Sequence, residues 1–176
     1  MKDLHIETKR LSIRPFQEKD LDLFLEFMLD ENATKYLMFT DEQKTKQGAT
    51  DLFNFVVNSY NTENPVHSYA IVDKEDNFVG SCGFSPLDET KKMYECYYSI
   101  LPRYWRQGFA TESTKALLEY CFNELGIEEM RAYMHPDNPM SEGVAKKVGM
   151  KYVDIETHPQ FGNEGKMYSI HRSDRV

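Results

Sequence analysis

Short runs of alternating hydrophobic and polar residues recur along the chain, and each run is typical of a β-strand with one buried face. The first run covers residues 4–16. Two later runs, residues 67–73 and 78–87, are joined by the turn-rich link KEDN, which is typical of a hairpin. Further strands are predicted at residues 93–101, 129–135, 150–157 and 166–172.

Other segments place hydrophobic residues three or four positions apart, which is the spacing of an amphipathic helix. Residues 18–31 put Leu21, Phe24 and Met28 on one face. A second helix is predicted to begin after Thr40, because the T-x-x-Q spacing to Gln43 matches a capping box.

Two more helices have clear end signals. One runs from about residue 108 to residue 125, and Gly126 is expected to end it. The other has Asn138 as its N-cap, Pro139 at its first position and Gly149 as its stop.

The order of these elements is a strand, two helices, three strands, a helix, a strand, a helix and two strands. It predicts one mixed α/β (α+β) domain over residues 1–176. The helix that starts at Gly108 would join two neighbouring parallel strands by a right-handed crossover. The loop that enters this crossover is a natural place for a ligand.

Composition and charge exclude several classes of protein. Hydrophobic residues make up 40% of the chain, yet no apolar run approaches the roughly 20 residues that cross a bilayer. The charged N-terminus lacks an export signal, and the three cysteines show no C-x-x-C spacing. We therefore expect a cytoplasmic protein with neither disulfides nor a metal site. A net charge of −8 disfavours nucleic acid as a partner.

The segment LPRYWRQGFATEST, residues 101–114, connects a predicted strand to a predicted helix through a basic turn that contains glycine. The first amides of a helix lack intrahelical partners, Gly108 would let the backbone approach a ligand closely, and Arg106 adds a positive charge. These features suit a phosphate or pyrophosphate. The turn lacks the spacing of dinucleotide and P-loop motifs. From the residues alone, Gly108 is equally well interpreted as a simple turn residue.

Several segments together resemble the GNAT superfamily of acetyl-CoA-dependent N-acetyltransferases, and most closely its branch of ribosomal-protein N-terminal alanine and serine acetyltransferases. YWRQGFATE resembles that branch's Y-W-G-K-G-Y-A-T-E segment, and NPMSEGVAKKVGM resembles its N-x-x-S-x-x-x-x-x-K-x-G-F segment. ETKRLSIRPFQEKDLDLF resembles its opening. The resemblance implies a single-domain GNAT-like acyl-CoA N-acyltransferase fold, with a mixed and mostly antiparallel central sheet flanked by helices.

The resemblance also implies a reaction, the transfer of acetyl from acetyl-CoA to a primary amine by direct attack. The acceptor would be a protein N-terminus or a small amine, and the residues leave this choice open. A non-catalytic acyl-CoA-binding or sensing module is the alternative from another class. Many relatives of this kind associate, so a homodimer is a further expectation.

The family implies a position for the cosubstrate. Backbone amides from residue 106 to residue 111 would hold the CoA pyrophosphate, and the end of the preceding strand would pair with the pantetheine arm between splayed strands. The implied CoA-binding residues are Ile100, Leu101, Arg106, Gln107, Gly108, Phe109, Ala110, Thr111, Asn138, Ser141 and Lys147. Asn138 also suffices as a plain N-cap, and Lys147 as a solvated helix lysine.

Two residues match catalytic positions of the family. Glu95 matches a glutamate commonly assigned as general base, and the resemblance favours this role over the alternative of an ion-pair partner on a strand face. Ser141 matches a serine near the thioester sulfur, and equally well satisfies the amides of a first helical turn. Ala145 stands where many members have a tyrosine that acts as proton donor. Tyr97 and Arg106 stand where relatives have glycine, so we expect a reshaped cleft and a bulkier, more cationic turn.

Aromatic residues are candidates for the acceptor pocket, although aromatic residues at this density are more often part of a core. The candidates are Tyr36, Phe39, Tyr69 and Phe84, together with His67 and Tyr94. Cys96 alternates with Glu95 along the strand, so it is expected to face the core.

Overall fold

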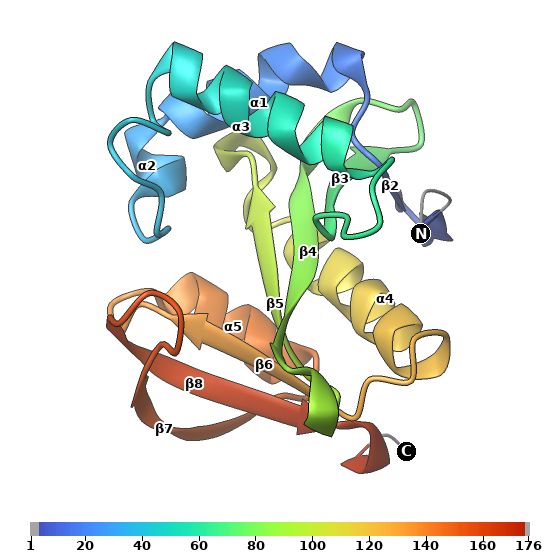
Figure 1. Ribbon diagram of the computed structural model, residues 1–176, viewed down its shortest axis with the longest axis vertical. Helices are drawn as coiled ribbons and strands as arrows, with labels where there is room; N and C mark the ends of the chain where they lie inside the picture. Colours follow the sequence, from blue (N-terminus) through green and yellow to red (C-terminus); the bar gives the residue numbers. More distant parts are fainter. Residues whose placement is uncertain (1–3, 175–176) are drawn as a thin grey trace.

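The computed structural model describes residues 4–174, which form one eight-stranded sheet with helices on both faces (Figure 1). The strand order is β1-β2-β3-β4-β5-β6-β8-β7. Neighbouring strands of the described chain run antiparallel except β5 and β6, which are parallel and are joined through α4. The predicted α/β class, the mostly antiparallel sheet and the crossover helix are thereby confirmed.

The long helices and the strands occur along the chain in the predicted order, apart from the first strand. The strands are β1 Ile6–Glu7, β2 Leu11–Arg14, β3 Ser68–Asp73, β4 Phe78–Asp88, β5 Met93–Ile100, β6 Glu129–Met134, β7 Lys151–Thr157 and β8 Glu164–His171. The α-helices are α1 Leu21–Leu29, α2 Glu31–Thr34, α3 Lys46–Ser59, α4 Phe109–Asn123 and α5 Pro139–Lys147. Short 3-10 turns are η1 Glu18–Asp20, η2 Glu89–Lys91, η3 Pro102–Tyr104 and η4 Arg172–Asp174.

The opening run, which was predicted to be one strand, is a hairpin of β1 and β2, with Ile6 opposite Ile13. The chain turns at Thr8, whose amide donates to the Leu11 carbonyl at 2.9 Å. Glu112 of α4 stabilises this turn, because it accepts hydrogen bonds from Thr8 Oγ1 (2.7 Å) and from a backbone amide of the turn (2.8 Å). The prediction of a single strand was therefore wrong, and the deciding contact comes from a distant helix.

The predicted start of the second long helix also needs correction. Thr40 and Gln43 do make the reciprocal bonds of a capping box, at 3.0 and 3.2 Å, but they enclose a separate turn. Helix α3 begins only at Lys46, with Thr45 Oγ1 accepting from the Gly48 amide at 3.1 Å. A Cβ atom at Gly48 would lie 2.0 Å from the Glu42 carbonyl oxygen, so this glycine lets the turn fold back onto the helix.

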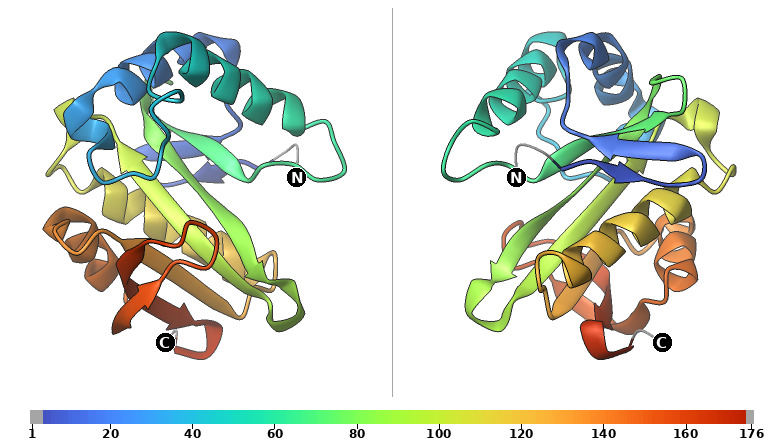
Figure 2. Two further views of the ribbon diagram at one scale, coloured as in Figure 1. Left: turned by 60° about the vertical axis from the view of Figure 1, so that its left-hand side comes forward. Right: turned by 90° about the vertical axis from the view of Figure 1, so that its right-hand side faces the viewer.

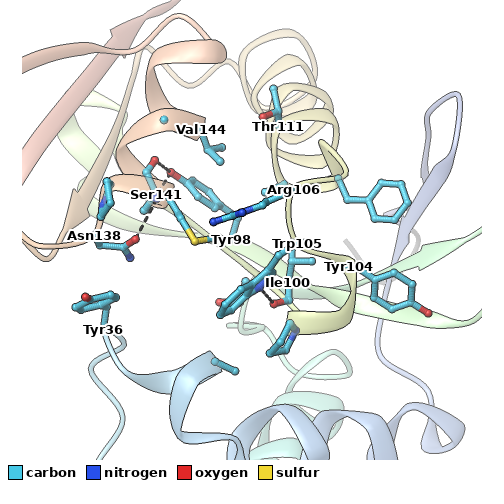
Figure 3. Close-up of a pocket in the computed structure, with 18 of the residues that line it drawn as sticks. Tyr36, Tyr98, Ile100, Tyr104, Trp105, Arg106, Thr111, Asn138, Ser141 and Val144 are labelled. Atoms are coloured by element: carbon cyan, nitrogen blue, oxygen red, sulfur yellow. Dashed lines mark hydrogen bonds between the residues drawn. The ribbon is translucent and has the colours of Figure 1, made fainter.

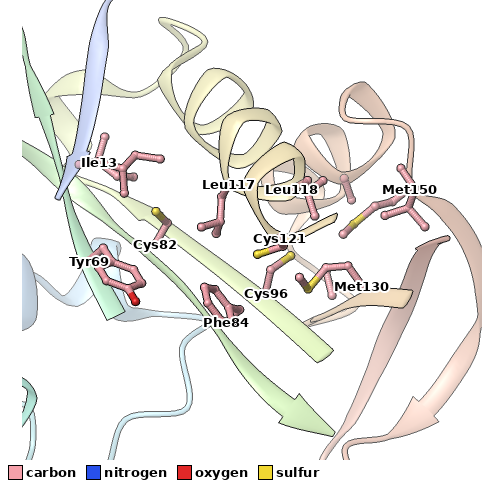
Figure 4. Packing of buried hydrophobic residues seen from close by; sticks show 14 of the residues in the cluster. Ile13, Tyr69, Cys82, Phe84, Cys96, Leu117, Leu118, Cys121, Met130 and Met150 are labelled. Atoms are coloured by element: carbon pink, nitrogen blue, oxygen red, sulfur yellow. The ribbon is translucent and has the colours of Figure 1, made fainter. Parts of the chain in front are cut away.

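Helices cover both faces of the sheet, and the side chains of β3 point alternately into the clusters on the two faces. Tyr69 and Ile71 pack in a cluster with α4, whereas Ala70 and Val72 pack in a second cluster with α1 and α3. Figure 2 shows α4 and α5 together on one side of the sheet. The first cluster holds the three buried cysteines, Cys82, Cys96 and Cys121 (Figure 4). Cys96 is thus a core residue, as predicted.

The strands β5 and β6 diverge after a short stretch of pairing. They are in register over three pairs, from Met93 opposite Glu129 to Glu95 opposite Arg131. Beyond this point β5 continues to Ile100 beside β4 alone, while β6 leaves in another direction (Figure 1). The divergence opens a gap in the middle of the sheet, and the gap positions the pocket described next.

Candidate active site

A pocket of about 660 Å³ lies beside this gap, between α2, the turn that enters α4, and α5 (Figure 3). Its lining brings together residues from three separate parts of the chain, residues 27–37, 98–111 and 138–147. Of the predicted CoA-binding residues, those that line it are Ile100, Arg106, Gly108, Phe109, Ala110, Thr111, Asn138, Ser141 and Lys147. Tyr36, predicted as an acceptor residue, also lines it and packs against the ring of His135 at 5.1 Å.

The free side of β5 forms one wall of the pocket. Tyr98, Ser99 and Ile100 lie beyond the last pair with β6, so their backbone groups on that side have no strand beside them. The Trp105 indole N–H donates to the Ile100 carbonyl at 2.7 Å and fixes the ring at the end of the strand (Figure 3). A strand with one free side can pair with an extended amide-bearing chain.

The N-terminus of α4 forms the cationic end of the pocket. The first intrahelical bond runs from the Glu112 amide to the Gly108 carbonyl at 3.0 Å, so the amides of residues 109–111 precede it and have no helical partner. Gly108 has φ of +83°, the left-handed conformation that glycine adopts without strain. Arg106 lines the same turn, which therefore suits a pyrophosphate.

The arginine at position 106 has a backbone consequence as well. Its φ is +61°, in the left-handed region where a side chain costs roughly 1–2 kcal/mol. The departure from the family's glycine is therefore a substitution at a position whose conformation favours glycine. The side chain adds a charge to the pocket at the expense of backbone strain.

Arg10 stabilises the turn that enters α4 through contacts with its backbone and side chains. Its guanidinium donates to the Gln107 carbonyl at 2.8 Å and to Glu112 at 2.6 Å, and it lies 4.6 Å from the centre of the Phe109 ring. This contact uses the carbonyl of Gln107, and Gln107 itself does not line the pocket. The turn is thus preorganised by a residue from the β1–β2 hairpin.

A pair of hydroxyl groups lies where the N-terminus of α5 meets β5, one from Ser141 of α5 and one from Tyr98 of β5. Asn138 Oδ1 accepts from the Ser141 amide at 3.1 Å, which confirms Asn138 as the N-cap. Ser141 Oγ donates to the Tyr98 hydroxyl at 3.1 Å, and that hydroxyl donates to the Ser141 carbonyl at 2.8 Å (Figure 3). Burial raises the pKa of Tyr98 above its ordinary value, so the phenol stays protonated. Ala145 is fully buried and takes no part.

Tyr98 was missed by the sequence reasoning, which looked for a tyrosine only at position 145. The available signal was the alternation of side chains along β5. Cys96 was predicted to face the core, and Tyr98, two residues later, must point to the same face of the strand, toward α4 and α5. Its contact with Ser141 joins residues 43 positions apart.

Glu95 lies on the opposite face of β5, at the point where the strands diverge, and outside the pocket lining. Its side chain is 16% exposed, and its Oε2 lies 2.8 Å from His158 Nε2. Burial raises the pKa of Glu95 above its usual value, and the His158 hydrogen bond opposes that change. The alternative interpretation, in which Glu95 is engaged by a partner on a strand face, thus has His158 as that partner, which the sequence did not indicate.

Several predicted site residues lie elsewhere. Leu101 is fully buried and belongs, with Phe39, to the cluster beneath α1 and α3. Tyr69 and Phe84 are 1% and 3% exposed and pack in the core beside α4 (Figure 4). Their proposed contacts with ligand stay predictions, and the core gives each of them a packing role that needs no ligand.

Tyr97, which stands where the family has glycine, does not line the pocket. Its hydroxyl is hydrogen-bonded to Ser68 Oγ, and its ring covers Gly83, where a Cβ atom would lie 2.5 Å from the ring. The tyrosine therefore connects β5 to β3 across β4. Its side chain lies outside the lining of the pocket, so the expected reshaping of the cleft by Tyr97 stays a prediction.

Residues 4–174 were also considered for membrane-spanning helices and metal-binding groups of side chains. None of the helices in this part of the chain is long and apolar enough to cross a membrane. Within the same residues, no three His, Cys, Asp or Glu side chains come together as a metal-binding group.

The fold and the pocket have the features that the resemblance implies for an acyl-CoA-dependent transferase, and comparison with known proteins agrees. A family model described as an acetyltransferase (GNAT) domain matches residues 10–151. The chain therefore belongs to the GNAT family of acetyltransferases, and it is an acetyl-CoA-dependent N-acetyltransferase.

Among curated relatives, the chain is 32% identical over 151 residues to the uncharacterized N-acetyltransferase YnaD of Bacillus subtilis, which covers 84% of this chain and 83% of YnaD. It is 30% identical over 135 residues to the uncharacterized N-acetyltransferase p20 of Bacillus licheniformis, which covers 76% of this chain and 75% of p20.

Solved structures show the same fold. A GNAT-family acetyltransferase from Bacillus anthracis matches with a TM-score of 0.80 at 25% identity, covering 97% of this chain and 99% of that one. A spermidine N-acetyltransferase from Vibrio cholerae, solved with CoA and spermine, gives 0.78 at 18% identity, with coverage of 95% and 98%. A ribosomal-protein-S5-alanine acetyltransferase from Vibrio fischeri gives 0.78 at 15% identity, with coverage of 98% for both.

Proposed function

We propose that this protein acetylates a primary amine by direct attack, with the cosubstrate in the pocket beside β5 and the acceptor amine entering from the Glu95 face. The observation that carries this proposal is the divergence of β5 and β6 immediately after Glu95 and Arg131. Since no strand fills the gap there, a group on the Glu95 face can meet a group on the Tyr98 face.

The residues present fit acetyl-CoA along the whole pocket. The amides of residues 109–111 and the Arg106 side chain would hold the pyrophosphate, with Lys147 near the phosphates. The free side of β5 would pair with the amides of the pantetheine arm, toward the Tyr98–Ser141 hydroxyls. Acetyl-CoA supplies an acetyl thioester there when bound.

Each chemical task then has a group on this chain. Glu95 accepts a proton from the amine as the nitrogen–carbon bond forms, and burial, which raises the pKa of this carboxylate, makes it a stronger base than an exposed glutamate. The hydroxyls of Ser141 and Tyr98 turn to hydrogen-bond to the sulfur as the carbon–sulfur bond breaks, and the thiolate that they stabilise takes its proton from water.

The acceptor is proposed only as a primary amine. Two of the solved structures described above are named for their acceptors, which are spermidine and an alanine of a ribosomal protein. A small amine and a protein are therefore both candidate acceptors for this fold. An acceptor screen must therefore include peptides that begin with alanine or serine, polyamines and amino sugars.

The test is to incubate the protein with acetyl-CoA and this amine panel and to measure released CoA thiol. The buried Cys82, Cys96 and Cys121 should give little background with a thiol reagent. We expect turnover with at least one amine, and a loss of roughly a hundredfold or more in the isosteric variant Glu95→Gln. CoA binding without turnover on any amine would contradict the proposal.

A further inference from the structure

We propose that His158, in the loop between β7 and β8, is a positioning residue that orients the Glu95 carboxylate for proton transfer. This role depends on the proposed function of Glu95 as the base. His158 carried no signal in the sequence, because it lies 63 residues from Glu95 and belongs to no motif that relates the two.

The hydrogen bonds of the imidazole define which nitrogen carries the proton. His158 Nδ1 lies 3.1 Å from the Gln160 amide and 3.2 Å from the Phe161 amide, and both of these groups are donors. Nδ1 therefore accepts, and in the neutral ring the proton is on Nε2. Nε2 then donates to Glu95 Oε2 across 2.8 Å.

The loop holds this ring in one orientation. His158 is only 4% exposed, and its ring packs against Tyr133 at 4.7 Å and Phe161 at 4.6 Å between centres. The loop closes on itself, because the His158 amide donates to the Asn163 carbonyl at 2.8 Å and the Gly162 amide donates to the His158 carbonyl at 2.9 Å. Burial, the two ring contacts and the two amides at Nδ1 together favour this one orientation of the imidazole.

The other groups that face Glu95 are engaged elsewhere. Its neighbour on β4 is Ser85, which carries no charge, and its neighbour on β6 is Arg131. The Arg131 guanidinium is bound to Glu129 at 2.7 Å and lies 3.9 Å from Glu156 of β7. Among the described residues, the hydrogen-bond donor at Glu95 is thus His158, which engages Oε2 and leaves Oε1 for the amine.

The experiment compares two variants at this position. His158→Phe keeps an aromatic ring for the contacts with Tyr133 and Phe161 but removes the donor, whereas His158→Gln keeps an N–H that can reach Glu95. The rate of acetylation of one amine is measured across pH, so that ionisation of the acceptor is the same for every protein. Melting temperature and CoA affinity are measured in parallel.

We expect His158→Phe to lower kcat roughly tenfold and to move the acidic limb of kcat/KM upward by about one pH unit, because the carboxylate loses its donor. His158→Gln should recover most of the rate. CoA affinity should be unchanged, since His158 does not line the CoA-side pocket. An unchanged pH limb in His158→Phe, or equal losses in both variants, would overturn the proposed role.

A double variant separates this role from the role of Glu95. If His158 acts through Glu95, adding His158→Phe to Glu95→Gln should cost almost nothing further. Full activity in Glu95→Gln alone would overturn the assignment of the base, and with it the premise for His158. A defective Glu95→Gln combined with an unaffected His158→Phe would overturn only the role of His158.

Discussion

Tyr98 of β5 and Ser141 of α5 are joined by two hydrogen bonds, from Ser141 Oγ to the phenol (3.1 Å) and from the phenol to the Ser141 carbonyl (2.8 Å). They tie the free end of a sheet strand to the first turn of a helix across the pocket. The pair places two hydroxyl groups beside the pocket in a protein whose residue 145 is alanine, where the resemblance implied a tyrosine.

The first prediction concerns these hydroxyls. Tyr98→Phe and Ser141→Ala should each lower kcat by roughly tenfold to a hundredfold with little change in CoA affinity, because the hydrogen bonds are needed by the developing thiolate. Tyr104→Phe is the matched control, since Tyr104 also lines the pocket and lies on η3 away from Ser141. Wild-type kcat in both variants would contradict this role.

The second prediction concerns the turn before α4, where one substitution should stabilise the fold and weaken CoA binding. Arg106→Gly should raise the free energy of unfolding by about 1 kcal/mol, because glycine adopts the positive φ of this position without strain. The same variant should weaken CoA binding by roughly threefold to tenfold, since a cation is lost. Urea denaturation and calorimetric titration with CoA measure the two effects.

Gly108→Ala is the companion variant in the same turn. Its φ of +83° is unfavourable for alanine, so this change should destabilise the protein by roughly 1–2 kcal/mol. If both variants changed stability in the same direction, the account of the turn's backbone would be wrong.

The third prediction concerns a buried ion pair that holds the opening of α1 to the sheet. Arg14 donates to both carboxylate oxygens of Asp20, at 2.7 and 2.9 Å, and their side chains are 7% and 2% exposed. Asp20→Ala should cost about 3–5 kcal/mol in unfolding free energy, because it leaves a buried guanidinium with only partial compensation. Arg103→Ala, which breaks an exposed pair with Glu26, should cost less than about 1 kcal/mol.

The fourth prediction concerns pH. Lys146, Lys166 and Tyr168 hydrogen-bond to Glu142 and lower the pKa of that carboxyl from 4.5 to about 2. Its contribution to stability is therefore present above pH 4.5 and is lost as the pH falls toward 2. Glu142→Gln should melt below the wild type at neutral pH, and the two melting curves should converge in acid.

Glu119→Gln is the control for the loss of a surface carboxylate, because Glu119 is exposed on α4 and this variant should melt like the wild type at neutral pH. A constant difference between Glu142→Gln and the wild type from pH 7 to pH 2 would contradict the role of the Glu142 carboxylate.

The amino-acid sequence by itself determined much of this protein. Alternating residues placed the strands, and local end signals were sufficient for α4 and α5, where Gly108 and Asn138 act at the predicted positions. The free amides of the turn that enters α4 were also predictable, because the amides of a helix N-terminus follow from local backbone geometry. These features depend on residues a few positions apart, and such residues are visible in the sequence.

Only the tertiary structure decided which distant side chains meet. The Tyr98–Ser141 and Glu95–His158 contacts join residues 43 and 63 positions apart, and no spacing rule relates such pairs. Tyr69 and Phe84 are a second example, because the sequence alone does not distinguish an aromatic residue of the core from one that lines a ligand pocket. Packing of the two faces of the sheet separates those cases, since only the folded chain determines which side chains it buries and which it leaves beside a gap.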